Sequence, residues 1–204
     1  HEHFDHIDGN QAMIAATGAT LLAHANARDK IANMDTGLRA GAVVKVGSLV
    51  ELEVLDTPGH TMSHVCLLSK TEVPALFSGD TLFNAGVGHC HAGGDPEVLA
   101  KTVFKQMDVL PDETLLYPGH DYIINNLGFT LDREPNNLAA QALLEQVQGQ
   151  DPNDALITNL GQERQINTFY RTSSTEIIKN FSDLAASATP KEVFLALRER
   201  RNSW

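Results

Sequence analysis

The chain has 204 residues, a formal net charge of −11 and 42% hydrophobic residues, an ordinary composition for a globular protein of one or two domains. The acidic balance excludes a broad basic surface for nucleic acid, and no apolar run reaches the roughly 18 residues that a membrane span needs. Cys66 and Cys90 are too few for a disulfide framework and favour a reducing, cytoplasmic location. An anionic small-molecule partner held by a few local cations is compatible with this charge, and the oligomeric state is left open.

The first 120 residues alternate between segments with strand and helix patterns. Helical spacing predicts helices over 9–17 and 96–109, the second with Pro96 in its first turn and Asp95 as N-cap. Apolar and acidic side chains alternate within 49–57, which predicts a strand with one buried face. Further short apolar runs bounded by turn residues predict strands at 19–25, 42–47, 64–69, 75–80 and 114–120.

The pattern changes after His120. Residues 121–204 show no strand alternation, and their helical spacing predicts helices over 137–148, 174–186 and 190–200. The sequence therefore predicts an α/β part followed by a helical part.

Histidines and aspartates stand where the predicted strands end. The chain opens on HEHFDH, and His60, Asp80 and His120 follow the apolar runs of LVELEVLDTPGH, ALFSGD and LLYPGH. Loops at strand ends are where open α/β proteins place ligands, and imidazole and carboxylate groups suit Zn(II), Fe(II) or Mn(II). Seven such groups exceed what one tetrahedral ion needs and predict two ions that share a carboxylate and activate a water. The seven are His1, His3, Asp5, His6, His60, Asp80 and His120.

Two other histidines are interpreted differently. His24 lies inside an apolar strand, which favours a hydrogen-bonded structural role. His64 begins a strand, where it is placed to cap or orient its neighbours.

These motifs resemble those of a known family. HEHFDH resembles the H-x-H-x-D-H signature of the metallo-β-lactamase superfamily, and TPGHTMSH, FSGDTLF and YPGHDY resemble its later motifs in the expected order. Within that superfamily the chain most resembles glyoxalase II, the hydroxyacylglutathione hydrolases. The stretches that carry this narrower resemblance are SGDTLFNAGVG, YPGHDYIINNLGF, EPNN, INTFYR and LRERRNSW.

The resemblance implies an αββα sandwich with a C-terminal helical domain that closes over the substrate. We place a metal-binding domain at 1–124 and a substrate-binding domain at 125–204. One metal would be held by His1, His3 and His60, and the second by Asp5, His6 and His120, with Asp80 bridging both. Two divalent ions are expected, zinc first, with iron or manganese as alternatives.

The resemblance also implies the reaction. A metal-bridging hydroxide would cleave the thioester of an S-(2-hydroxyacyl)glutathione, such as S-D-lactoylglutathione in methylglyoxal detoxification, to a 2-hydroxy acid and a free thiol. Asp5, a metal ligand, could also accept a proton. Tyr122, Arg198 and Arg201 match family positions that contact glutathione. From the residues alone, RERR equally indicates a solvated helix end favoured by the helix dipole.

The chain departs from the family pattern at three places. Where the family has a lysine and a tyrosine for glutathione, the loop GVGHCHAGG places His89 and His91, and a neutral histidine is a weaker carboxylate partner. An extra metal or redox site at His89, Cys90 and His91 is the alternative to a plain loop contact. Ser63 replaces a common glycine, which would restrict a turn with positive φ. The family also has strands before its first motif, so we expect strands to precede His1 in the complete protein.

Rival functions remain at this point. A persulfide dioxygenase of the same superfamily would use one iron held by His60, Asp80 and His120. A non-catalytic metal-binding module is the second rival, although a full ligand set favours open coordination positions and chemistry.

Overall fold

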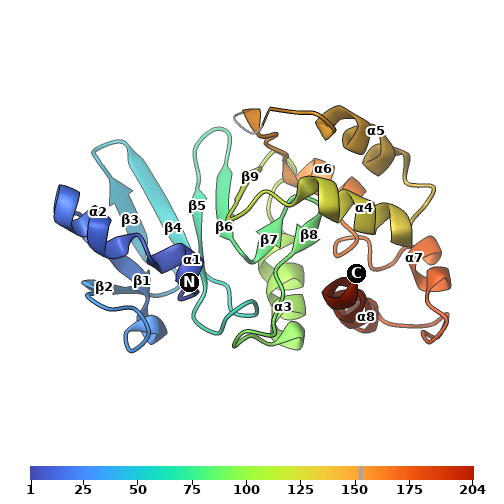
Figure 1. Ribbon diagram of the computed structural model, residues 1–204, viewed down its shortest axis with the longest axis horizontal. Helices are drawn as coiled ribbons and strands as arrows, with labels where there is room; N and C mark the ends of the chain where they lie inside the picture. The colour runs from blue at the N-terminus through green and yellow to red at the C-terminus, as the bar shows by residue number, and fades with distance from the viewer. Residues whose placement is uncertain (152–153) are drawn as a thin grey trace.

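The structure is a computed structural model that describes residues 1–151 and 154–204 (Figure 1). Its centre is a five-stranded mixed sheet in the order β3-β4-β5-β6-β9. Neighbouring strands pair antiparallel except β6 and β9, which run parallel. The strands are β3 (Val43–Val46), β4 (Val50–Asp56), β5 (Val65–Ser69), β6 (Ala75–Gly79) and β9 (Leu115–Pro118).

The other elements of the first 120 residues are short. β1 and β2 form a parallel pair outside the main sheet, and β7 and β8 form an antiparallel hairpin soon after Asp80. In chain order these elements are α1 (Phe4–Ile7), α2 (Asn10–Thr17), β1 (Leu22–His24), η1 (Ala25–Ala27), β2 (Thr36–Leu38), β7 (Leu82–Phe83), β8 (Gly86–Val87), α3 (Pro96–Thr102) and η2 (Val103–Met107).

The sequence predictions hold for most of this region. All six predicted strands are present, although 19–25 contributes only the three residues of β1. The helix predicted at 96–109 begins as expected, because the Asp95 side chain accepts hydrogen bonds from the backbone N–H groups of Glu97 and Val98. Its second half is the π-helical segment η2, which spacing did not predict. Strands β2, β7 and β8 were also missed, since two or three residues are too few to show alternation.

The C-terminal part consists of helices in the residues that the structure describes. They are α4 (Ile123–Arg133), α5 (Leu138–Val147), α6 (Leu160–Ile166), α7 (Thr175–Asn180) and α8 (Pro190–Ser203). The predicted helices over 137–148 and 190–200 are confirmed as α5 and α8, whereas α4 and α6 were not predicted. The prediction of a helix to residue 186 was wrong, because Phe181 leaves helical geometry and buries its ring in the core.

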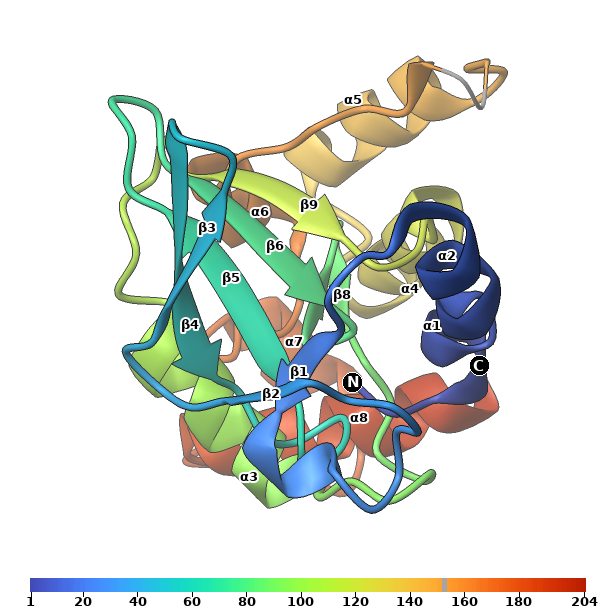
Figure 2. The same ribbon diagram turned by 90° about the vertical axis from the view of Figure 1, so that its left-hand side faces the viewer.

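The main core lies between the sheet and the helices α3, α6 and α8. Figure 2 shows β4, β5, β6 and β9 side by side, with α3 and α8 on their far side. Fully buried side chains fill this space, and burying one of their size contributes about 1.5–3 kcal/mol. They include Leu76, Leu99, Leu116, Leu160, Phe169, Phe194 and Leu197. The sheet and the C-terminal helices therefore share one core.

The turn between β7 and β8 is fixed from the helical part. Ala85 has a φ of +56°, which is unfavourable for a residue with a side chain. Its N–H donates to the buried carboxylate of Glu163 on α6, at 2.8 Å. Thr158 and Asn167 also donate to this carboxylate. Helix α6 thus holds the hairpin that leads away from Asp80.

Both cysteines are free, as expected. Both are also buried, and burial raises the thiol pKa of each to about 11. Within residues 1–151 and 154–204, every helix is too short or too polar to cross a membrane.

Candidate metal centre

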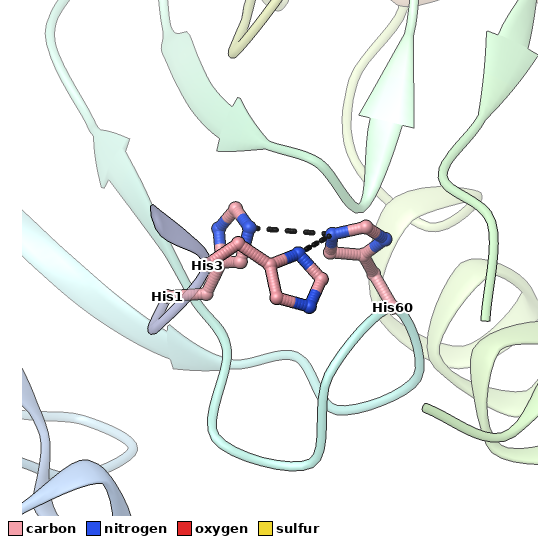
Figure 3. Close-up of side chains that lie close together, drawn as sticks. All are labelled: His1, His3 and His60. Carbon is pink, nitrogen blue, oxygen red and sulfur yellow. Dashed lines mark hydrogen bonds between the residues drawn. The ribbon is translucent and has the colours of Figure 1, made fainter. Parts of the chain in front are cut away.

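Three histidines from two distant segments converge beside the sheet. His1 and His3 come from the opening segment, and His60 comes from the loop between β4 and β5 (Figure 3). Nε2 of His60 lies 2.9 Å from Nδ1 of His3 and 3.2 Å from Nε2 of His1. These three residues form what we call the buried group, since the side chains of His1 and His60 are each only 1% exposed.

A second set lies next to the first. Asp5 and His6 come from α1, and His120 follows β9. Nε2 of His120 lies 3.1 Å from Nε2 of His6 and 3.2 Å from Oδ2 of Asp5. We call these three residues the exposed group, because the Asp5 side chain is 56% exposed and that of His120 is 27% exposed.

Asp80 lies between the two groups, directly after β6. Its Oδ2 is 3.4 Å from Nε2 of His60 and 3.5 Å from Nε2 of His120, and its Oδ1 is 3.3 Å from Nε2 of His6. Oδ1 is buried and has no hydrogen-bond partner within the described part of the chain. A carboxylate oxygen in that position is costly unless a cation neutralises it.

These separations fit shared metal ions. Two ligand atoms that each lie about 2.0–2.1 Å from a tetrahedral ion are roughly 3.3 Å apart, and the distances above scatter around that value. Within the described residues, the groups able to hold an ion consist only of the seven predicted residues, and all seven take part. The structure therefore brings the seven predicted residues together and fits two divalent cations.

Backbone carbonyls set the orientation of the buried group. Nδ1 of His60 donates to the carbonyl of His89 at 2.6 Å, and Nε2 of His3 donates to the carbonyl of Ala92 at 2.8 Å. A carbonyl only accepts, so the other nitrogen of each ring carries no proton and faces the centre. This is the usual way in which a protein fixes the tautomer of a metal-binding histidine.

His64 orients Asp80, as its place at the start of β5 predicted. The buried ring accepts the backbone N–H of Asp80 through Nε2 at 3.1 Å, and its Nδ1 lies 2.9 Å from the hydroxyl of Thr57. Gly79 leaves room for this ring, because its φ is +48° and a Cβ there would lie 2.8 Å from Nε2 of His64. His64 thus acts on the metal centre through Asp80.

The structural role predicted for His24 is also confirmed. Its Nδ1 accepts the backbone N–H of Asn26, and its Nε2 lies 3.2 Å from Oδ1 of Asp56. Both ring nitrogens are engaged in local contacts.

Burial shifts the pKa values of two histidines and of the shared aspartate. It lowers the pKa of His60 to about 3 and also lowers the pKa of His6, while it raises the pKa of Asp80. A neutral imidazole binds a metal without first releasing a proton. Burial therefore favours the unprotonated form of His6 and His60 beside Asp80.

A cavity of about 230 Å³ adjoins the centre. The Tyr122 ring stacks on His120 with centroids 5.3 Å apart, and the His89 ring lies 4.8 Å from that of His60. The lining residues are Phe83, Val87, His89, His91, Tyr122, Asn126, Arg198, Arg201 and Asn202. All five residues predicted to contact substrate are among them. The other four were missed because nothing in the sequence marks them as lining residues; they are Phe83, Val87, Asn126 and Asn202.

The two arginines differ in their freedom. Arg198 is buried and donates to the carbonyls of Val87 and Gly88, so much of its guanidinium is already engaged. Arg201 is less buried and donates to the side chain of Asn126. Arg201 is therefore the freer cation for an anionic ligand.

Two departures from the family pattern can be located in the structure, the loop with His89, Cys90 and His91, and Ser63. The rings of His89 and His91 stack 3.8 Å apart, and Cys90 belongs to no metal-capable group of the described residues. The raised pKa of the Cys90 thiol disfavours redox chemistry. Ser63 lies outside the positive-φ region, which only Asn33 and Ala85 enter among the described non-glycine residues. Because Ser63 does not have a positive φ, its side chain does not restrict this turn.

Comparison with known proteins defines the class first. Residues 1–120 match the family model of the metallo-beta-lactamase superfamily, so the chain belongs to that superfamily. Residues 121–204 match the model described as hydroxyacylglutathione hydrolase C-terminus. Membership of the superfamily implies that the protein binds divalent metal.

Individual relatives narrow the assignment. Proteins named hydroxyacylglutathione hydrolase from Nitrosococcus oceani and from Polaromonas sp. are 58% and 57% identical to the chain. Each match covers 100% of this chain and 79% of the relative. The chain belongs to the hydroxyacylglutathione hydrolase family.

Solved structures agree with this fold. ETHE1 from Myxococcus xanthus superposes with a TM-score of 0.62 at 26% identity, covering 100% of this chain and 74% of that one. The BLEG-1 B3 metallo-beta-lactamase gives a TM-score of 0.61 at 23% identity, covering 83% and 74%. The predicted α/β fold with a C-terminal helical part is confirmed.

Proposed function

We propose that this protein hydrolyses the thioester of an S-(2-hydroxyacyl)glutathione, such as S-D-lactoylglutathione, to a 2-hydroxy acid and free glutathione. The observation that carries the proposal is the convergence of six metal-binding side chains on Asp80, beside a cavity lined by two arginines. The buried Oδ1 of Asp80 has no hydrogen-bond partner in the described part of the chain. The names of the relatives at 57–58% identity supply the substrate class.

The buried group would hold one ion and the exposed group the other, with Asp80 bound to both. Zinc is the first expectation, and iron or manganese suits the same nitrogen and oxygen donors. Two such ions would polarise the thioester carbonyl and make a water acidic enough to react near neutral pH.

The side chains around the centre divide the remaining work. His64 fixes the backbone of Asp80, and the carbonyls of His89 and Ala92 fix the rings of His60 and His3. Asp5 is the residue placed to accept a proton, because its carboxylate is half exposed at the edge of the centre. The small cost of burying it is outweighed by its backbone hydrogen bond and by nearby histidines, so its pKa is lowered and it stays ionised.

The cavity would bind the glutathione part of the substrate. Glutathione carries two carboxylates, which call for cations and hydrogen-bond donors. Arg201 offers a partly exposed guanidinium, and Tyr122 offers a hydroxyl and a ring beside His120. Burial lowers the pKa of His89 to about 4, so we expect it to act as a neutral hydrogen-bonding group. In this division, 1–124 binds metal and 125–204 contributes the arginines.

The location we propose is the cytoplasm. Both cysteines are unpaired, and glutathione serves as a free thiol in a reducing compartment.

The decisive test measures hydrolysis of S-D-lactoylglutathione and metal content in the same sample. Turnover with two ions per chain supports the proposal. Two ions per chain without hydrolysis of S-D-lactoylglutathione, but with hydrolysis of another thioester, would keep the hydrolytic centre and reject this substrate. One iron per chain and oxygen uptake with glutathione persulfide would support the dioxygenase instead, and metal without any turnover of thioesters would support a non-catalytic module.

A further inference from the structure

Glu2 stands between two predicted ligands but points away from the metal centre. Residues 1–3 belong to no helix or strand, and His3 has extended backbone angles, φ −66° and ψ 148°. Neighbouring side chains of an extended segment point to opposite sides. His1 and His3 accordingly face His60, and Glu2 faces the other way.

The Glu2 carboxylate is tied to the loop that carries His60. Its Oε2 accepts the hydroxyl of Thr61 at 3.0 Å, and its Oε1 accepts the hydroxyl of Ser63 at 3.0 Å. Thr61 directly follows His60 in the chain. Two hydrogen bonds therefore connect the segment that supplies two ligands to the loop that supplies the third.

A third segment completes the contact. Lys30, from the turn after η1, donates from Nζ to Oε1 of Glu2 at 2.5 Å and lies 3.4 Å from the hydroxyl of Ser63. The Glu2 side chain is only 10% exposed. A carboxylate with so little access to water needs such partners, because burying a charge without them is expensive. All three partners lie on one side, opposite the histidine rings.

The loop itself is stiff enough to transmit this connection. Thr57 N–H donates to the carbonyl of His64, which closes the loop, and Gly59 N–H donates to the carbonyl of Thr61. Gly59 cannot be replaced without collision, since a Cβ would lie 2.4 Å from the Cα of Leu99. Holding Thr61 and Ser63 thus holds His60.

We propose that Glu2 is a positioning residue of the metal centre, whose carboxylate holds His1 and His3 in register with His60 through Thr61, Ser63 and Lys30. The proposal rests on the metal centre put forward above. It assigns a role to the residue between the first two histidines and predicts that ion binding by the buried group depends on a carboxylate that never touches the ion. Groups that orient metal ligands are typically worth about 10- to 100-fold in affinity.

The test compares metal affinity among variants by competition with a chromophoric chelator. Glu2→Ala should weaken one of the two sites about tenfold or more and leave the other within about twofold. Ser63→Ala, which removes one donor and keeps the fold of the loop, should weaken the same site about two- to fivefold. In cobalt-loaded protein, the visible absorption of the weakened site should shift in Glu2→Gln, because the ligand geometry changes.

The control is Glu51→Gln, which removes an exposed ion pair with Lys45. Its metal affinities should equal those of the unchanged protein. Equal affinities and cobalt spectra in the Glu2 and Ser63 variants, with a lower Tm alone, would overturn the proposal and leave a purely structural contact. Failure of the unchanged protein to bind metal would instead reject the metal centre itself, so the two failures can be told apart.

Discussion

The buried group and the exposed group use the same kinds of donor but are held very differently. In the buried group, His60 and His3 each donate to a backbone carbonyl. In the exposed group, no hydrogen bond to the second ring nitrogen of His6 or His120 occurs within residues 1–151 and 154–204. The two groups therefore have the same ligand chemistry, but only the buried group has hydrogen bonds to backbone carbonyls that fix its rings.

This difference teaches that the two ions should not behave alike. A ligand whose orientation is fixed before binding loses less entropy when the ion arrives. The side chains of His1 and His60 are also shielded from water, whereas Asp5 is more than half exposed. We expect the ion of the buried group to be the tighter one, and the exposed group to be the more adaptable side of the centre.

The largest expected effect comes from removing a ligand of the buried group. His60→Ala should lower kcat by about 10³-fold or more, because several kcal/mol of transition-state stabilisation depend on the metal. Bound metal, counted by mass spectrometry of digested protein, should fall by about one ion per chain. His24→Gln removes a histidine outside the centre and should leave the count unchanged. Full activity in His60→Ala would break the assignment of both groups.

Stepwise metal removal compares the groups directly. With increasing chelator, the ion of the exposed group should leave first, at a concentration roughly tenfold lower than the ion of the buried group. Asp5→Asn should widen this gap, since an amide is a weaker ligand than a carboxylate. Simultaneous loss of both ions would show that the two sites are coupled through Asp80 more strongly than the hydrogen bonds of the buried group separate their affinities.

Substrate binding can be separated from either group. Arg201→Met should raise KM about five- to tenfold and change kcat less, because a partly exposed charge–carboxylate contact is lost while the metal ligands stay in place. Arg200→Met is the matched control on α8, since Arg200 pairs with Asp183 and does not line the cavity. An unchanged KM in Arg201→Met would remove this residue from the glutathione site.

The smallest effect on activity is expected from Glu163, which holds the β7–β8 hairpin and acts on stability instead. Burial raises the pKa of Glu163 from 4.5 to about 7 despite its hydrogen bonds. Because the folded-state pKa is raised, the stability that protonated Glu163 contributes is fully present below pH 4.5 and is lost as pH rises through about 7. The shift corresponds to about 3 kcal/mol.

Glu163→Gln should remove this pH dependence. The free energy of unfolding, measured by urea titration, should therefore increase relative to that of the unchanged protein as pH rises from 4.5 to 7. Exposed Glu145→Gln should show no such gain. A constant difference between the unchanged protein and Glu163→Gln across this range would show that Glu163 is ionised throughout.

Much of the molecule was determined by local sequence. Apolar runs located the strands, Asp95 and Pro96 located the start of α3, and the ligand types at strand ends located the centre, because each signal depends on near neighbours in the chain. The sequence analysis missed α4 and α6, although Pro135 follows the end of α4 and a capping box of Asn159 and Gln162 marks the start of α6. Local patterns could not reveal the early end of α7, where burial of Phe181 overrides helix propensity.

Tertiary structure alone decided how the ligands are supported. Residues far apart in the chain, such as Glu2 and Ser63, His60 and His89, or Ala85 and Glu163, meet only after the sheet has formed. The sequence by itself determined which residues can bind metal, because that depends on their chemistry. Which group is buried, which carbonyl fixes which ring and which arginine remains free depend on packing between distant segments, and no local pattern encodes them.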